Sequence, residues 1–333
     1  MVSRNDDHGE GLLKRMSLCI NNIIHFTNKY KIDTELIIVD WNPPQKRKLL
    51  LEVLPKPNKS KYLIIKYIVV PNDIHLLYDR SEEIPLFQMI GKNVGIRRAN
   101  GKFILCTNID ILFTDKIMRE LSKKNLDTQY FYRANRCDVP NDIDLTWSSE
   151  YQLSYCAKNI MHRLGKNPKY LNLLTAPPIV YKLPFLATLL NYIHGIKRRL
   201  TQDPVKIIEW NLDTQACGDF TLMSKEAWFD VQGYLELDLY SIHIDTLLLI
   251  AATARGYKQY IFEPEKCIYH IHHESGWESM NPVEKIKFVE KRPGIGMDLI
   301  YEVGPYMLNR KIQFDLNKDT WGFSDVNFDE YEY

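Results

Sequence analysis

The stretch FILCTNIDILF, residues 103–113, contains the pattern that decides the fold of this chain. Four apolar residues, Phe103 to Cys106, predict a buried strand, and a polar step at 107–110 ends it before apolar residues resume. One interpretation of the step is an ordinary turn, because Asn and Asp are common in turns. The other is a site at which a strand end presents oxygen atoms to a cation and a phosphate.

Apolar segments on the N-terminal side of this stretch predict an α/β fold. Helical spacing of apolar residues indicates helices, and short β-branched runs ended by Pro or Asp indicate buried strands. The alternation is typical of a mostly parallel, Rossmann-like central sheet flanked by helices, in which ligands bind at the carboxyl ends of the strands. The expected helices are 10–29 and 86–101, and the expected strands are 35–39, 62–70 and 103–107.

Two parts of the chain are less regular. Only Met1 to Ser3 precede a polar run at the N-terminus, so the first strand is either very short or trimmed. The stretch 150–210 is helix-rich and predicts a helical insertion. After it we expect strands at 214–222, 258–262 and 267–272, a helix that opens near Ser224, and a helix 244–255 that Gly256 ends.

Composition argues against several classes of protein. The 333 residues carry a formal net charge of +1, which does not indicate a face for nucleic acid. Six scattered cysteines without a CxxC pattern favour reduced thiols, so we expect a cytoplasmic protein.

No apolar run approaches the roughly 20 residues that span a bilayer. The segment 171–199 holds three prolines and ends in Lys197-Arg198-Arg199. We interpret it as part of the buried helical insertion, and the alternative is an amphipathic segment that lies on a membrane surface.

Several motifs, in their order along the chain, resemble the GT-A fold glycosyltransferases of the family-2-like type. The segment 92–104, KNVGIRRANGKFI, followed by Asn108-Ile109-Asp110, is similar to their nucleotide-sugar signature, in which a strand ends in Asp-x-Asp. VSRND at 2–6 and ELIIVDWNPP at 35–44 resemble their first two strands, and 218–245 resembles their acceptor region. With the segment 92–104 upstream, the site interpretation of 107–110 is preferred to the turn.

The resemblance implies a donor that is a nucleotide-diphosphate sugar, expected to be a UDP-sugar, and a glycan or other hydroxyl acceptor. It also implies a nucleotide-sugar-binding half at 1–115 and an acceptor half at 116–305. A C-terminal tail at 306–333 follows, and we expect its acidic, aromatic end FSDVNFDEYEY, residues 323–333, to be loosely attached. The residues expected to bind the donor are Ser3, Arg4, Asn5, Asp40, Lys92, Asn93, Asn108, Ile109 and Asp110.

A divalent cation, Mn²⁺ or Mg²⁺, is expected to neutralise the diphosphate and help it leave. Asp110 is the direct ligand in this interpretation, and Asn108 replaces the usual Asp, so that it ligates weakly and brings no charge. His270 and His272 alternate along a strand and should face the same side, which suits a metal. His273 should point the other way.

An inverting transfer needs a general base, and a carboxylate is the usual choice. The resemblance places Asp245 in that role and Asp219 as an acceptor or sugar contact. Two other functions stay open. A metal-dependent hydrolase could use the His-x-His pair with an Asp, and Asn108 favours a GT-A-like binding module without activity.

Overall fold

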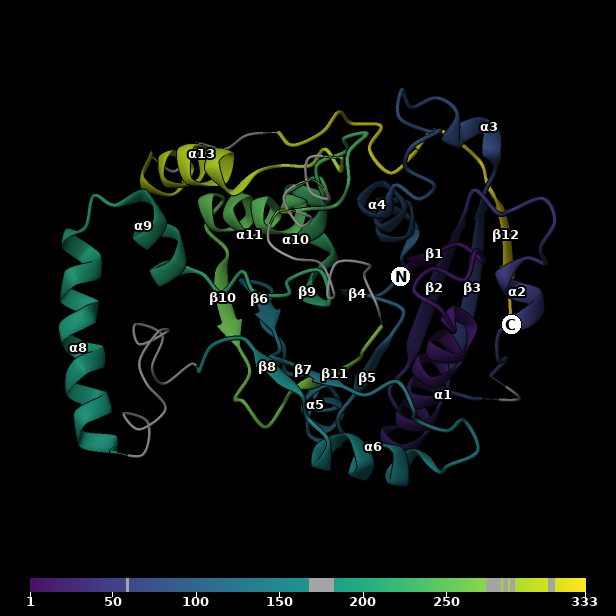
Figure 1. Cartoon of the computed structure of the whole chain (residues 1–333), viewed down its shortest axis with the longest axis horizontal. Coiled ribbons are helices and arrows are strands. Elements are labelled where there is room, and N and C mark those ends of the chain that lie inside the picture. The colour runs from purple at the N-terminus through teal and green to yellow at the C-terminus, as the bar shows by residue number, and fades with distance from the viewer. Residues whose placement is uncertain (58–59, 168–182, 274–282, 284–286, 288–290, 311–314) are drawn as a thin grey trace.

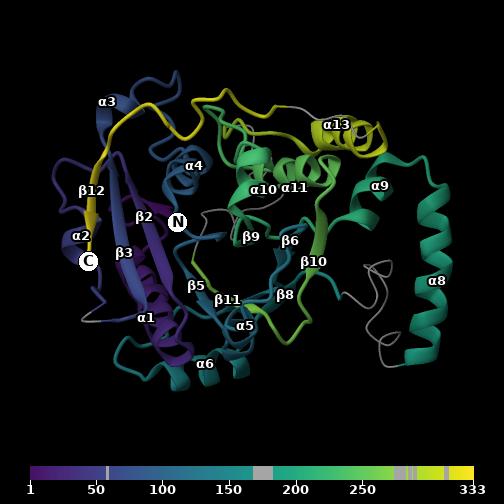
Figure 2. The same cartoon turned by 180° about the vertical axis from the view of Figure 1, so that it is seen from behind.

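The computed structural model describes residues 1–57, 60–167, 183–273, 283, 287, 291–310 and 315–333. The predicted α/β class is confirmed: three four-stranded sheets are flanked by helices (Figures 1 and 2). No helix in these ranges is long and apolar enough to cross a membrane.

The first sheet has the order β1-β2-β3-β12, and its first three strands are parallel. Successive side chains on a strand of this sheet face opposite sides, one covered by α1 and the other by α4. Leu36 and Ile38 of β2 face α1, whereas Ile37 and Val39 face α4. The elements are β1 (Val2–Ser3), α1 (Leu12–Tyr30), β2 (Thr34–Trp41), α2 (Leu50–Val53), β3 (Leu63–Val70), α3 (Asn72–His75) and α4 (Gln88–Arg98).

Two further sheets form the rest of the strand framework, with orders β10-β6-β9-β4 and β5-β11-β7-β8. The strands are β4 (Phe103–Thr107), β5 (Ile111–Phe113), β6 (Tyr130–Arg133), β7 (Arg136–Val139), β8 (His162–Leu164), β9 (Phe220–Ser224), β10 (Lys258–Ile261) and β11 (Ile268–Ile271). The helices are α5 (Asp115–Leu121), α6 (Ser149–Lys158), α8 (Pro184–Leu200), α9 (Pro204–Asn211), α10 (Lys225–Asp230), α11 (Ile244–Ala254) and α13 (Met297–Arg310).

Strand pairing is more mixed than the sequence predicted. Among the described strands, four pairs are parallel and five are antiparallel. The main reason is β9, which runs antiparallel to both β4 and β6. It begins at Phe220 rather than near 214, because residues 215–219 form a turn.

A cavity lies beside β1 inside the sheet region. β4 is the edge strand of its sheet, and residues 34–36 of β2 pair with β3 alone. Between them lies a cavity of about 440 Å³ that α1 and α4 cover from the two faces, with Met1 lining it. The cavity occupies the line along which β1 would continue toward its N-terminal side.

The C-terminal segment is attached more firmly than we expected. β12 (Asp329–Glu332) pairs antiparallel with β3, and its Tyr331 lies opposite Tyr67. Lys66 of β3 forms ion pairs with Glu35, Glu330 and Glu332. The acidic side chains that suggested a loose tail therefore meet a cation on the neighbouring strand.

The stretch 150–210 contains α6, α8 and α9, as the predicted helical insertion requires, and residues 168–182 lie outside the described residues. α8 stands apart from the body of the molecule and reaches it through α9 (Figures 1 and 2). Phe185 and Leu189 on α8 are exposed, so this part of the insertion is not the buried helix that we expected.

Candidate active site

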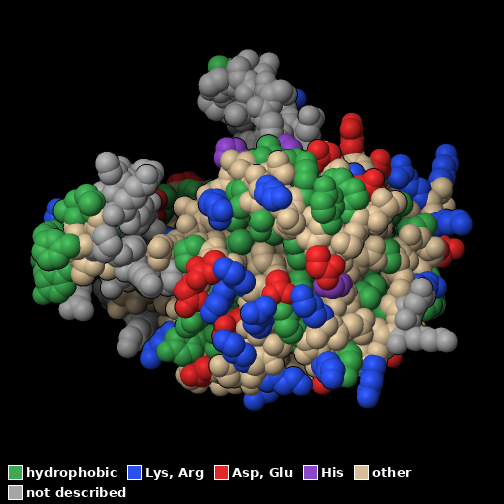
Figure 3. All heavy atoms as spheres, turned by 90° about the horizontal axis from the view of Figure 1, so that it is seen from below, with side chains coloured by type: hydrophobic (Ala, Val, Ile, Leu, Met, Phe, Trp, Pro, Cys, Tyr) green, Lys and Arg blue, Asp and Glu red, His purple; other side chains and the backbone are tan. Residues whose placement is uncertain are grey.

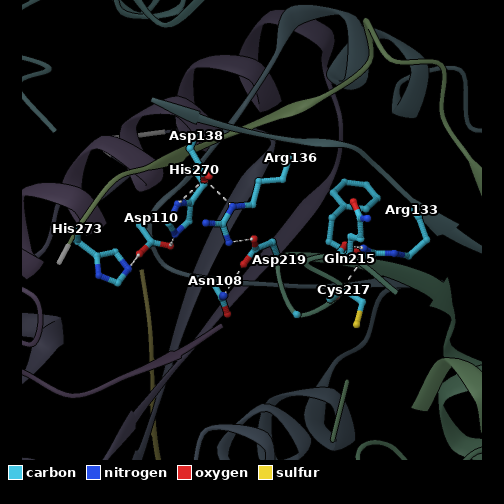
Figure 4. Close-up of polar contacts among 12 residues, drawn as sticks. Asn108, Asp110, Arg133, Arg136, Asp138, Gln215, Cys217, Asp219, His270 and His273 are labelled. Carbon is cyan, nitrogen blue, oxygen red and sulfur yellow. Dashed lines mark hydrogen bonds and ion pairs between the residues drawn. The ribbon is translucent and has the colours of Figure 1, made fainter. Parts of the chain in front are cut away.

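A cluster of polar side chains lies where β4 ends and β5 begins (Figure 4). Asp110 stands one residue before β5, which pairs antiparallel with β11, so that His270 of β11 lies opposite Ile111. β7 flanks β11 on its other side, and Asp138 lies opposite His270. Strand register therefore brings three residues together that lie far apart in the sequence.

Asp110, His270 and His273 form a group that could hold a metal ion. The Asp110 oxygens lie 3.8 Å from His270 Nε2 and 3.2 Å from His273 Nε2. One candidate ligand atom from each residue lies within 4.8 Å of the other two. Asp110 and His270 are buried, and Asp110 Oδ1 has no hydrogen-bond partner. An unpartnered buried carboxylate oxygen beside two imidazoles fits a cation.

Neighbouring charges favour the ionised form of Asp110. Burial acts to raise the pKa of Asp110, but the bond from His273 and the charges of His270 and Arg15 hold that pKa below its usual value. Arg15 of α1 lies 3.9 Å from Asp110 and donates to the backbone oxygens of His8 and Gly9. Arg15 thus links the loop after β1 to the candidate metal group.

Asp138 orients His270 from the side opposite the cluster. Its Oδ1 lies 3.1 Å from His270 Nδ1, which leaves Nε2 directed toward Asp110. Burial opposes ionisation of Asp138, but its bonds to His270 and Arg136 lower its pKa to about 2. Burial also opposes charge on His270, yet Asp138 and Asp110 raise its pKa above the usual value. A carboxylate behind a histidine is a common support of metal sites.

Arg136 joins this cluster to the acceptor-side residues. Its guanidinium donates to Asp138 at 2.6 Å and to Asp219 at 2.9 Å. Asp219 stands in the turn before β9, which Arg133 of β6 holds by donating to the backbone oxygens of Gln215 and Cys217. Arg136 contacts Asp219 directly, and Arg133 holds the turn in which Asp219 lies. Asp219, which the sequence predicted as a site residue, is therefore part of this network.

Asn108 is hydrogen-bonded through both ends of its side-chain amide. Its oxygen accepts from Lys92 at 2.8 Å and from Gln88 at 3.1 Å, and its nitrogen donates to Asp219 at 2.6 Å. These bonds direct the amide to Lys92 and Asp219 rather than to the candidate metal group. The expectation that Asn108 ligates a metal is not supported by its contacts, since its oxygen already accepts two bonds.

His272 and His273 exchange the roles that the sequence predicted for them. β11 ends at Ile271, so the strand alternation that placed His270 and His272 on one face does not extend to residue 272. His273, which we expected to point away, contacts Asp110 and replaces His272 in the candidate metal group.

Asp245 lies near the other end of the network. It opens α11, and its Oδ1 accepts from the backbone of Thr246. A Cβ added to Gly218 would lie 3.0 Å from Asp245 Oδ2 and 3.8 Å from Lys92 Nζ. Asp245 and the buried Lys92 therefore both lie close to the backbone of Gly218, whose oxygen accepts from Lys92 at 2.9 Å.

Asp40 is the penultimate residue of β2 and lies in register with Ser3 of β1. Its side chain is fully buried, Oδ2 accepts from the backbone of Leu50, and Oδ1 has no hydrogen-bond partner. Burial raises the pKa of Asp40 to about 6. Oδ1 of Asp40 is therefore a buried acceptor without a hydrogen-bond partner.

The remaining predicted donor residues contact protein groups. Arg4 donates to Asn42 O and Asn5 donates to Lys48 O, so both hold the loop after β2. Asn93 donates to Tyr234 O and Glu236 Oε1 and accepts from Tyr234 N, which ties α4 to residues 234–236. Ile109 packs against the core that α1 covers.

Sequence reasoning missed Arg15, Arg136 and Asp138. Arg136 and Asp138 lie on β7, a strand with alternating charges, RCDV, that gave no apolar signal. A charged residue within a helix that is otherwise apolar on one side was the only signal for Arg15.

No family model and no curated protein matches the chain. Among solved structures, the chain is similar to GalNAc-T7, crystallised with UDP, GalNAc and Mn²⁺, at 14% identity and a TM-score of 0.40. The match covers 84% of this chain and 44% of that one, so the chain spans less than half the length of this neighbour.

Proposed function

We propose that the protein is a metal-assisted glycosyltransferase. Its donor is a nucleotide-diphosphate sugar, expected to be a UDP-sugar, and its acceptor is a hydroxyl group. One observation carries the proposal. The candidate metal group of Asp110, His270 and His273 is continuous, through Asp138, Arg136 and Asp219, with Asn108 and Lys92. The order of motifs in the sequence supports the same function.

Asp110, His270 and His273 would hold the divalent cation. Two of the three ligands are imidazoles, so among the expected ions the site favours Mn²⁺ over Mg²⁺, which prefers oxygen ligands. The bound cation would supply positive charge to the diphosphate. Asp138 keeps His270 in the orientation that presents Nε2, and Arg15 holds the loop that borders the group.

Lys92, Asp219 and Asp245 would act on the transferred sugar and the acceptor. Lys92 is a buried cation and provides positive charge near the donor. Asp245 is the general base for the acceptor hydroxyl in this proposal, and Asp219 contacts the sugar or the acceptor. Asp40, near the adjoining strand end, would lie beside the base; because it is fully buried, direct contact with the base would require the residues that cover it to move.

Replacement of Asp245 by Asn tests the assignment of the base. We expect kcat to fall by roughly 100-fold or more, the usual contribution of a general base, with little change in donor affinity. Steady-state transfer assays and donor titrations measure the two quantities separately. Asp33→Asn, at an exposed position, is the matched control. Equal loss of turnover and donor binding would indicate a structural Asp and remove Asp245 from the proposal.

A metal-dependent hydrolase is the second candidate, because a specific observation favours it. That function needs three protein ligands, and Asp110, His270 and His273 provide them. The metal content of the purified protein and its product distinguish the two functions. Zinc in the protein, with hydrolysis that no acceptor hydroxyl diverts, would favour the hydrolase over the transferase.

A further inference from the structure

α8 carries an exposed apolar stripe along its whole length. Phe185, Leu189, Tyr192, Ile196 and Leu200 recur at steps of three or four residues, so they share one side of the helix. Their exposed fractions are 83%, 45%, 68%, 46% and 75%, respectively. Ala187, by contrast, is fully buried. The stripe therefore faces solvent, whereas the helix is covered at Ala187.

This concentration of exposed apolar groups is specific to α8. Of the 21 large apolar side chains exposed among the described residues, eight lie between Leu183 and Leu200. Figure 3 shows green side chains gathered at the left edge of the molecule, where α8 lies. Contiguous apolar surface of this kind marks an interaction site, whereas apolar residues that are exposed singly are common on any protein surface.

The charges of α8 indicate what covers the stripe. The helix contains no Asp or Glu, and the run Lys197-Arg198-Arg199 stands near its C-terminal end. A helix with an apolar side and basic residues matches the surface of an anionic bilayer, where apolar residues enter the headgroup region and cations bind anionic lipid. Because α8 stands clear of the body, a flat surface can reach its full length (Figures 1 and 2).

We propose that α8 binds the surface of a membrane that contains anionic lipid, with its axis in the plane of the surface. The exposed stripe enters the headgroup region, and the positive charge that the sequence carries at 197–199 attracts anionic lipid. The proposal uses residues outside the candidate active site and is independent of the proposed function, so that either can fail alone.

Co-sedimentation with vesicles tests the proposal. We expect the full chain to bind vesicles of phosphatidylcholine mixed with phosphatidylserine, and to bind phosphatidylcholine alone far more weakly. Phe185→Ser combined with Leu200→Ser should weaken binding roughly tenfold or more, because two inserted side chains are lost. Leu76→Ser combined with Leu77→Ser is the matched control, since these apolar residues are also more than half exposed, at 59% and 69%, but lie outside α8.

A second variant tests the charges. Replacement of Lys197, Arg198 and Arg199 by Gln should remove the preference for anionic vesicles and weaken binding roughly tenfold or more. Failure of the unaltered chain to bind either vesicle would overturn the proposal. So would equal binding by the α8 variants, or a dimer in light scattering that Phe185→Ser with Leu200→Ser converts to a monomer, since a second copy would then cover the stripe.

Discussion

In the proposed glycosyltransferase, Asn108 replaces the first aspartate of an Asp-x-Asp motif, and its contacts suit an amide at this position. Its amide nitrogen lies 2.6 Å from an oxygen of Asp219. A carboxylate at 108 would place two like charges in hydrogen-bond contact and would cost free energy. Asn108 donates to Asp219 and accepts from Lys92, and in the proposed function Asp110, His270 and His273 bind the cation.

Asp138 is predicted to act through His270. Asp138→Asn removes the charge behind the imidazole, so we expect affinity for Mn²⁺ to fall about 10-fold to 100-fold, the usual effect of losing such a support. Titration of the protein with Mn²⁺ in a calorimeter measures this affinity. The control is Asp33→Asn, which should leave the affinity unchanged. Unaltered Mn²⁺ affinity in Asp138→Asn would contradict the positioning role.

Asp40 gives a stability prediction with a defined pH dependence. Its pKa of about 6 in the folded chain exceeds the ordinary value of 3.8, so folding disfavours its ionised form. The ionised group costs up to about 3 kcal/mol above pH 6 or so, and the cost disappears as the pH falls toward 4. Asp40→Asn should therefore raise the free energy of unfolding near neutral pH and have little effect in mild acid. Urea unfolding at both pH values checks this, and an equal effect at both would contradict it.

At the scale of elements, apolar spacing predicted the first half well. The predicted helix 10–29 corresponds to α1, and the predicted strands 35–39 and 62–70 lie within or within one residue of β2 and β3. Their apolar residues face a core on one or both sides, which is the condition that makes periodicity visible. β7 was missed because its alternate positions hold Arg136 and Asp138, which face polar partners instead of a core.

The cavity between β2 and β4 predicts that an added strand would stabilise the fold. An apolar, β-branched extension of five or so residues before Met1 should pair with β2 and β4 and bury apolar surface, which contributes about 25 cal/mol per Å². We expect a higher melting temperature in calorimetry. A Gly-Ser extension of the same length is the control. Equal melting temperatures for the two extensions would show that the cavity does not accept a strand.

At the scale of the whole molecule, the order of motifs predicted part of the candidate site. The structure brings Asp110, His270, Asp219 and Asn108 into one network, although they come from segments as far apart as β4 and β11. The sequence could not predict Asp138 or His273, because cross-strand register and the residue at which a strand ends depend on tertiary packing. For the same reason the sequence predicted His272, and not His273, as a metal ligand.

The central claim is that Asp110, His270 and His273 hold a cation beside the donor. The most direct measurement is the shift in melting temperature with Mn²⁺ and UDP-sugars, because a ligand that binds only the folded state raises it. Adjacent histidines supply a matched pair: His272→Ala should keep the metal-dependent shift, whereas His273→Ala and Asp110→Asn should lose it. Absence of any shift in the unaltered chain, or its loss in His272→Ala but not in His273→Ala, would contradict the claim.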